Sequence, residues 1–161
     1  MTESSPKIKS YSSNSNIVDV ACKGIDIDAA FDVDEIEERA QQILAFMGCN
    51  RCELSVVLCN DSFIQELNQE YRQKNMATDV LSFPLSEIPL EKPLDTLLGD
   101  VVVSVDTALR QATEFNDSLM NEMTSLIVHG ILHLLGYSHE NDENEAKMKA
   151  MAFELLNLFK N

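Results

Sequence analysis

The sequence lacks any run of about 20 consecutive apolar residues, the length that a membrane-spanning helix requires. Its first residues, MTESSPKIKSYSSNSN, also lack the apolar centre of a secretory signal. We therefore expect a cytoplasmic protein that makes no membrane contact. The chain has 161 residues, of which 45% are apolar, and this suffices for one folded domain with a sizeable core.

Cysteine is also scarce, because the chain contains only four. Four cysteines are too few for a disulfide scaffold in a chain of this length. Cys49 and Cys52 form a C-x-x-C pair, which in other proteins serves redox chemistry or zinc binding. No second pair completes a four-cysteine site, so ordinary buried thiols are the favoured interpretation.

Basic residues are few: 12 Lys and Arg stand against 27 Asp and Glu, a formal net charge of −15. Such a surface repels polyanions at long range, whereas phosphate contacts normally supply most of the affinity for nucleic acids. Any RNA-binding surface must therefore be a small, local basic patch, and DNA is not an expected partner.

Hydrophobic patterning predicts strands over residues 17–22, 53–59, 78–83 and 99–105. Helices are expected to begin at Asp32, at Asp61 (which would cap the second helix), and near residues 106, 118 and 141. The proline-containing segment 84–97 reads as a loop. These elements predict a single α/β (α+β) domain over residues 16–161, with a mixed sheet of about four strands and about five helices. Residues 1–15 read as a flexible tail.

All three histidines of the chain lie in one stretch, HGILHLLGYSH. His129 and His133 are four residues apart, which places both on one face of a helix. Gly136 is expected to end that helix, so that His139 can turn back towards the other two. Three neutral imidazoles without a fourth protein ligand are typical of an open zinc site, although other divalent transition metals accept the same ligands. Core or surface histidines are the alternative.

The spacing equals that of zinc proteases with the motif H-E-x-x-H-x-x-G-x-x-H. In those enzymes the glutamate after the first histidine is the general base, but here that position is Gly130. The spacing therefore favours a metal site and leaves peptide hydrolysis without its proton acceptor.

The stretch closely resembles the signature H-G-x-L-H-L-x-G-Y-D-H of the YbeY family, bacterial zinc-dependent endoribonucleases also called rRNA maturation factors. Similar motifs occur in the same order at LNQEYR (67–72), TDVLSFP (78–84) and LGDVVVS (98–104), and Met148 and Glu154 fall in the matching final helix. The resemblance covers roughly residues 50–156.

The resemblance implies a mixed sheet of about four strands with helices around it, and one Zn²⁺ per chain held by His129, His133 and His139. It implies that Arg72 is the catalytic arginine near the metal. The expected activity is cleavage of single-stranded RNA in rRNA maturation and ribosome quality control. Ribosomal RNA is then the substrate, and ribosomal proteins or ribosomal subunits are candidate partners.

Without the family resemblance, the sequence indicates a catalytic role for Arg72 only in part. A guanidinium can hold a phosphate with two hydrogen bonds and stabilise charge that develops in phosphoryl transfer. An arginine at a helix end is equally typical of a solvated charge. Lys74 can steer RNA or be solvated, and Thr78 and Asp79 can shape the site or serve as caps.

One residue departs from the family signature, because Ser138 stands where the signature has aspartate. This change removes a carboxylate that could accept a proton or orient a metal ligand. Glu140 or Asp142 could replace it, or the position could be a simple turn residue.

Two other functions remain open at this stage. One is a non-catalytic ribosome assembly factor with a zinc site, and the other is a metal hydrolase of another substrate, such as a peptide. For RNA cleavage, attack by water and attack by the RNA 2′-hydroxyl are equally compatible with the sequence.

Overall fold

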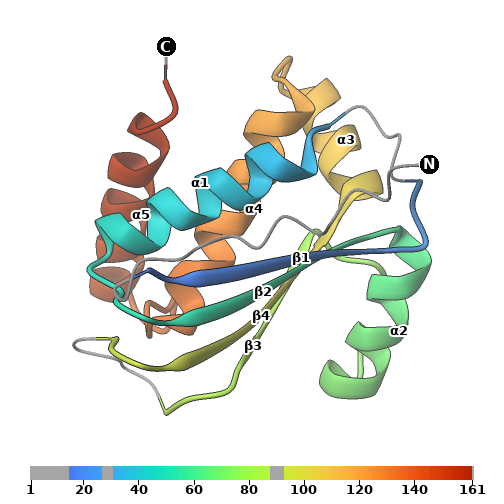
Figure 1. Cartoon of the computed structure of the whole chain (residues 1–161). Coiled ribbons are helices and arrows are strands. Elements are labelled where there is room, and N and C mark those ends of the chain that lie inside the picture. The colour runs from blue at the N-terminus through green and yellow to red at the C-terminus, as the bar shows by residue number, and fades with distance from the viewer. Residues whose placement is uncertain (1–14, 27–30, 88–92, 161) are drawn as a thin grey trace, which may run out of the picture.

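The computed structural model describes residues 15–26, 31–87 and 93–160 (Figure 1). All but the last residue of the expected tail, 1–15, lies outside this part of the chain. The strands are β1 (Ile17–Lys23), β2 (Glu53–Cys59), β3 (Val80–Pro84) and β4 (Leu97–Ser104). The helices are α1 (Val33–Phe46), α2 (Asp61–Arg72), α3 (Val105–Glu114), α4 (Leu119–Leu134) and α5 (Asp142–Asn157).

The four strands form one mixed sheet in the order β1-β2-β4-β3. β1, β2 and β4 are parallel, and β3 pairs antiparallel with β4, so β3 is an edge strand. The predicted fold class is confirmed. In the described part of the chain, no helix is both long enough and apolar enough to cross a membrane.

Helices cover both faces of this sheet (Figure 1). Val101 and Val103 of β4 belong to the larger core, together with buried residues of α1, α4 and α5. Val102 points to the opposite face, where it packs with Ile64 of α2 in a smaller cluster. Burial on both faces explains why β4 is an almost continuous apolar run in the sequence.

Two sequence predictions were wrong in detail. The cap of α2 is Asn60, whose side chain accepts a hydrogen bond from the Phe63 backbone N–H, and Asp61 is the first helical residue. The expected loop over 84–97 is shorter at both ends, since Pro84 ends β3 and Leu97 begins β4. Pro84 is tolerated because edge strands accept a residue that lacks an N–H donor.

The four cysteines are free thiols, as the sequence predicted. Cys49 and Cys52 are buried. Burial, followed by the neighbouring Cys52, raises the pKa of Cys49 to about 12. A thiol that stays protonated is a poor nucleophile and a poor metal ligand, which argues against chemistry at this pair.

Gly130 determines how closely α4 approaches the sheet. A Cβ built at this position would lie 2.5 Å from Cγ1 of Val101 on β4 and 3.2 Å from Oγ of Ser82 on β3. The Gly130 carbonyl also accepts a hydrogen bond from Ser82 Oγ at 3.1 Å. The backbone of α4 therefore rests directly on β3 and β4, and this contact fixes the residues on either side of Gly130.

Replacing Gly130 with alanine is expected to lower the free energy of unfolding by up to about 2 kcal/mol. Alanine gains about 1 kcal/mol in helix propensity. Overpacking against the stiff, buried Val101 costs roughly 1–3 kcal/mol and outweighs that gain. Urea unfolding measures the difference, with Ser125→Ala in the same helix as a control that adds no contact with the sheet. Gly130→Ala that is more stable than the parent protein would contradict this packing.

Candidate metal centre and its cleft

The end of α4 is shaped by a glycine turn that brings the histidine stretch back on itself. Gly136 has φ of 104°, a conformation that side chains disfavour. The Gly136 N–H donates to the His133 carbonyl, and the Tyr137 N–H donates to the Leu132 carbonyl at 3.0 Å. This pair of bonds is a Schellman motif, which ends a helix and satisfies its last carbonyls.

The same turn orients one imidazole. His133 Nδ1 lies 3.1 Å from the carbonyl oxygen of Tyr137. A carbonyl only accepts, so Nδ1 carries the hydrogen and Nε2 keeps its lone pair. Metal-ligating histidines are commonly held in this way by a carbonyl or carboxylate behind the ring.

The three imidazoles of the chain lie together at the end of this turn. Nε2 of His129 is 3.1 Å from Nε2 of His133 and 3.3 Å from Nε2 of His139. One ligand atom from each residue lies within 4.8 Å of the others. A tetrahedral zinc ion with Zn–N bonds of about 2.0–2.1 Å separates its nitrogen ligands by roughly 3.4 Å. The cluster therefore fits one small ion of this kind, and it could hold another divalent metal.

Burial and neighbouring charges favour the neutral form of two of these rings. Burial lowers the pKa of His129, and the nearby His133 and His139 lower it further. Burial also lowers the pKa of His133, followed by the effects of His139 and Arg72. Neutral imidazoles at pH 7 have the free lone pairs that metal binding requires.

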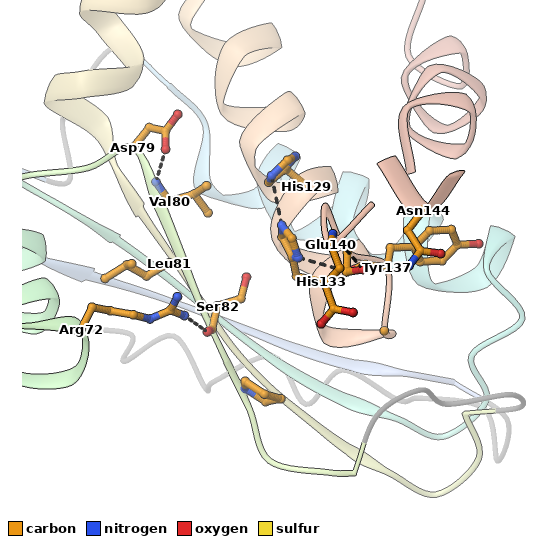
Figure 2. Close-up of a pocket in the computed structure, with 13 residues that line it drawn as sticks. Arg72, Asp79, Val80, Leu81, Ser82, His129, His133, Tyr137, Glu140 and Asn144 are labelled. Atoms are coloured by element: carbon orange, nitrogen blue, oxygen red, sulfur yellow. Dashed lines mark hydrogen bonds between the residues drawn. The ribbon is translucent and has the colours of Figure 1, made fainter. Parts of the chain in front are cut away.

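A cleft of about 590 Å³ opens beside the imidazoles. His129 and His133 line it from α4, and Arg72 lines it from the end of α2. In Figure 2, Arg72 approaches β3 from one side and the two histidines lie on the other. The structure therefore brings Arg72 and these two histidines, which come from different helices, to one cleft.

Ser82 connects the two sides of the cleft. Its carbonyl oxygen accepts a hydrogen bond from Arg72 Nη2 at 3.1 Å (Figure 2), and its hydroxyl donates to the Gly130 carbonyl. Arg72 makes no ion pair with any residue that the structure describes. Its guanidinium is thus held in place while its other N–H groups stay available to an anion.

Three acidic or polar candidates from the sequence also line the cleft: Asp79, Ser138 and Glu140. The Asp79 carboxylate accepts from the Val80 N–H at 2.8 Å and from Gln111 Nε2 at 3.3 Å. It therefore both caps the start of β3 and faces the cleft. Asp142 begins α5 instead.

None of the other lysines and arginines in the described part of the chain lines the cleft. Arg51 pairs with Asp95 and Arg110 pairs with Asp61, in both cases at 2.8 Å. Lys74 is exposed. Among the described residues that line the cleft, Arg72 is the one lysine or arginine.

Sequence reasoning missed the roles of Ser82 and Tyr137. Both act through backbone carbonyls, which every residue has, so no side-chain signal marks them. Asn144 of α5, which also lines the cleft, was missed as well because nothing in its local sequence points to a site.

Comparison with known proteins gives a consistent result. The family model described as Endoribonuclease YbeY matches residues 22–160, which includes residues 22–49 that the motif resemblance did not reach. An Endoribonuclease YbeY from Aquifex aeolicus is 52% identical over 114 residues, or 71% of this chain and 74% of the relative. One from Syntrophus aciditrophicus is 43% identical over 71% of each chain.

A solved structure supports the same relationship. A solution structure of a protein from Thermotoga maritima superposes with a TM-score of 0.61 at 28% identity, and the match covers 86% of this chain and 87% of the other. The family model spans most of the chain and includes the histidine turn, Arg72 and the β3–β4 pair. The chain therefore belongs to the YbeY endoribonuclease family.

Proposed function

We propose that this protein is a single-strand-specific, metal-dependent endoribonuclease that acts in rRNA maturation and ribosome quality control in the cytoplasm. The observation that carries the proposal is a cluster of three imidazoles beside an open cleft, which His129, His133 and the anchored Arg72 line. The names of the relatives, Endoribonuclease YbeY, support the reaction. The proposed active domain comprises residues 16–161.

In this proposal His129, His133 and His139 hold one Zn²⁺ per chain. A zinc ion there would supply Lewis-acid polarisation of a phosphate oxygen, or a water molecule of lowered pKa. His133 is kept in the ligating tautomer by the Tyr137 carbonyl. Arg72, as the catalytic residue, binds the non-bridging phosphate oxygens and stabilises the charge that develops on them.

The geometry disfavours the two alternative functions. A purely structural zinc site usually has four protein ligands, whereas this cluster has three imidazoles and borders a cleft. Peptide hydrolysis of the zinc-protease type needs a glutamate at position 130. That position is Gly130, where even a Cβ would lie 2.5 Å from Val101 Cγ1, so a side chain as long as glutamate would push α4 away from the sheet.

The test is to incubate metal-loaded protein with single-stranded RNA and, in parallel, with the same sequence as a duplex. We expect cleavage of the single strand and not of the duplex. A 2′,3′-cyclic phosphate at the product end identifies attack by the RNA 2′-hydroxyl, whereas a 3′-hydroxyl together with a 5′-phosphate identifies attack by water. Loaded protein that leaves single-stranded RNA intact would refute the enzyme and favour the assembly factor.

Ser138 gives a further prediction, because it lines the cleft beside the proposed metal ligands. Its Oγ accepts only a long hydrogen bond, 3.5 Å, from the Glu140 N–H. A serine is a poor proton acceptor at neutral pH. Ser138→Asp is therefore expected to raise the single-turnover cleavage rate, by about tenfold, at equal metal content.

Ser138→Asn is the matched control, since it has the shape of aspartate without the charge. If Asn raises the rate as much as Asp, the gain comes from orientation and not from proton transfer. If Asp leaves the rate unchanged while zinc stays bound, position 138 has no such role. Glu140, which also lines the cleft, is then the next proton acceptor to test.

A further inference from the structure

We propose that Tyr71 forms a stacking site for one unpaired nucleobase beside the metal cleft, an inference that rests on the endoribonuclease function proposed above. Tyr71 lies in the last turn of α2, directly before Arg72. The residue is 57% exposed, so its ring is accessible to a ligand. Exposed aromatic faces of this kind bind bases of single-stranded nucleic acids.

The ring of Tyr71 is held in position by β3. Its centroid lies 5.2 Å from that of Phe83, with the ring planes at 63°. Phe83 packs in turn against the smaller core that contains Ile64 and Leu81. Such edge contacts between aromatic rings contribute to stability beyond their buried area, so the ring of Tyr71 is preorganised.

Tyr71 and Arg72 act as a pair because they rest on consecutive residues of the same strand. Arg72 donates to the carbonyl of Ser82, and Tyr71 contacts the next residue, Phe83. The guanidinium that would hold a phosphate and the ring that would stack a base are therefore anchored by adjacent points of β3. In a single strand, phosphates and bases alternate along the chain in the same way.

The edge of the sheet at β3 leaves a bound RNA a route from Tyr71 and Arg72 to the imidazoles. Side chains alternate between the faces of a sheet, and Ser82 points towards Gly130 of α4 whereas Phe83 points towards α2. β3 is the edge strand, so no further strand separates the two faces there. An RNA that crosses this edge can place one phosphate by Arg72, near His133, and a neighbouring base on Tyr71.

Because the protein is strongly acidic, phosphate contacts supply little of its affinity for RNA, and stacking is needed to add to that affinity. With a net charge of −15 and a single arginine lining the cleft among the described residues, few phosphates can be neutralised. Stacking on an aromatic ring adds affinity that does not depend on charge and tolerates every base. It also requires an unpaired base, which would explain a preference for single strands.

Other exposed aromatic residues lack these features. The Lys160 ammonium lies over the ring of Phe153, 5.4 Å from its centroid, and competes with a base for that face. Phe115, 71% exposed, follows α3, and neither of its chain neighbours lines the cleft, whereas Tyr71 directly precedes Arg72. Phe115 therefore provides a control for the loss of an exposed aromatic residue elsewhere on the surface.

The test compares Tyr71→Leu with Tyr71→Phe on a short oligoribonucleotide without secondary structure. Leucine keeps an apolar contact with Phe83 but has no aromatic face, whereas phenylalanine keeps the face. We expect Tyr71→Leu to raise KM about tenfold with little change in kcat, and Tyr71→Phe and Phe115→Leu to behave as the parent protein does. An unchanged KM for Tyr71→Leu, or an equal rise for Phe115→Leu, would overturn the proposal.

An abasic scan of the oligoribonucleotide separates stacking from a general packing defect. One position near the scissile phosphate should raise KM for the parent protein and leave KM for Tyr71→Leu unaffected, because the base and the ring are then lost together. Equal penalties in both proteins would refute the contact. Failure of the parent protein to cleave any RNA would instead refute the proposed function, so the two failures are distinguishable.

Discussion

His133→Ala is expected to remove most of the bound metal and to lower RNA cleavage by more than about 100-fold. Losing a residue that merely orients a metal ligand already costs roughly 10–100-fold, and a ligand itself should cost more. His133 contributes two features at once, since its Nε2 lies 3.1 Å from that of His129 and its Nδ1 is bound to the Tyr137 carbonyl. Elemental analysis of the purified variant measures the metal content.

His139→Ala is the cleaner companion variant. Its side chain is exposed, so alanine removes a ligand without opening a cavity in the core. We expect near-native circular dichroism and thermal unfolding for metal-free His139→Ala, together with loss of metal. The same loss is expected for His129→Ala. Full metal content in all three variants would eliminate this site.

The sequence predicted the elements of this fold well where one local signal dominates. The helical spacing of His129 and His133, followed by Gly136, indicated a helix that ends at the glycine, and in the structure the chain turns there with φ of 104° at Gly136. The apolar run over residues 99–105 likewise predicted a strand, and the structure has β4 over Leu97–Ser104. Both features depend on residues within a few positions of one another.

Prediction from the sequence failed where two neighbouring residues suit the same role and contacts with distant residues decide which of them takes it. Asn60 and Asp61 are both good helix caps. In the structure Asn60 caps α2 and also donates to the Gly24 carbonyl, whereas the Asp61 carboxylate accepts from Ser104 and Thr107 at the start of α3. Those partners lie more than 30 residues away, so the local sequence cannot assign the roles.

The groups of the candidate site also fall into those that the sequence revealed and those that it did not. Its side-chain groups, the imidazoles and the guanidinium, were visible in the sequence because their residue types are rare in this chain or match a known motif. Its backbone groups were not, since the carbonyls of Ser82 and Tyr137 carry no residue-specific signal. At position 130 the sequence showed only that the glutamate of the zinc-protease motif is replaced by glycine. The close packing of α4 against the sheet at Gly130 became visible in the structure.

Arg72→Ala is expected to lower RNA cleavage by about 100- to 1,000-fold while the metal stays bound. This is the typical cost of removing one preorganised donor that stabilises developing negative charge. Arg72 is exposed, and its bond to the Ser82 carbonyl orients it in the cleft without an ion pair to compete with a phosphate among the described residues. Single-turnover cleavage and elemental analysis on the same sample measure both quantities.

Two variants show whether RNA cleavage requires the planar guanidinium of Arg72, with its paired N–H donors, or only a positive charge. Arg72→Lys keeps the positive charge but cannot bind a phosphate with two parallel hydrogen bonds, so it should restore little activity. Lys74→Ala removes an equally exposed charge two residues further along, outside the residues that line the cleft, and should retain most activity. Full activity in Arg72→Lys would show that charge alone is sufficient. Equal losses in Arg72→Ala and Lys74→Ala would show that both act by general attraction and that Arg72 contacts no phosphate directly.

The salt dependence of RNA binding tests the same point independently. For single strands, the logarithm of the binding constant falls with the logarithm of salt concentration by about 0.7 for each phosphate that is neutralised. With Arg72 as the one lysine or arginine among the described residues that line the cleft, the slope should correspond to about one or two contacts and become shallower in Arg72→Ala. A steep slope that Arg72→Ala leaves unchanged would place RNA on a different surface of the protein.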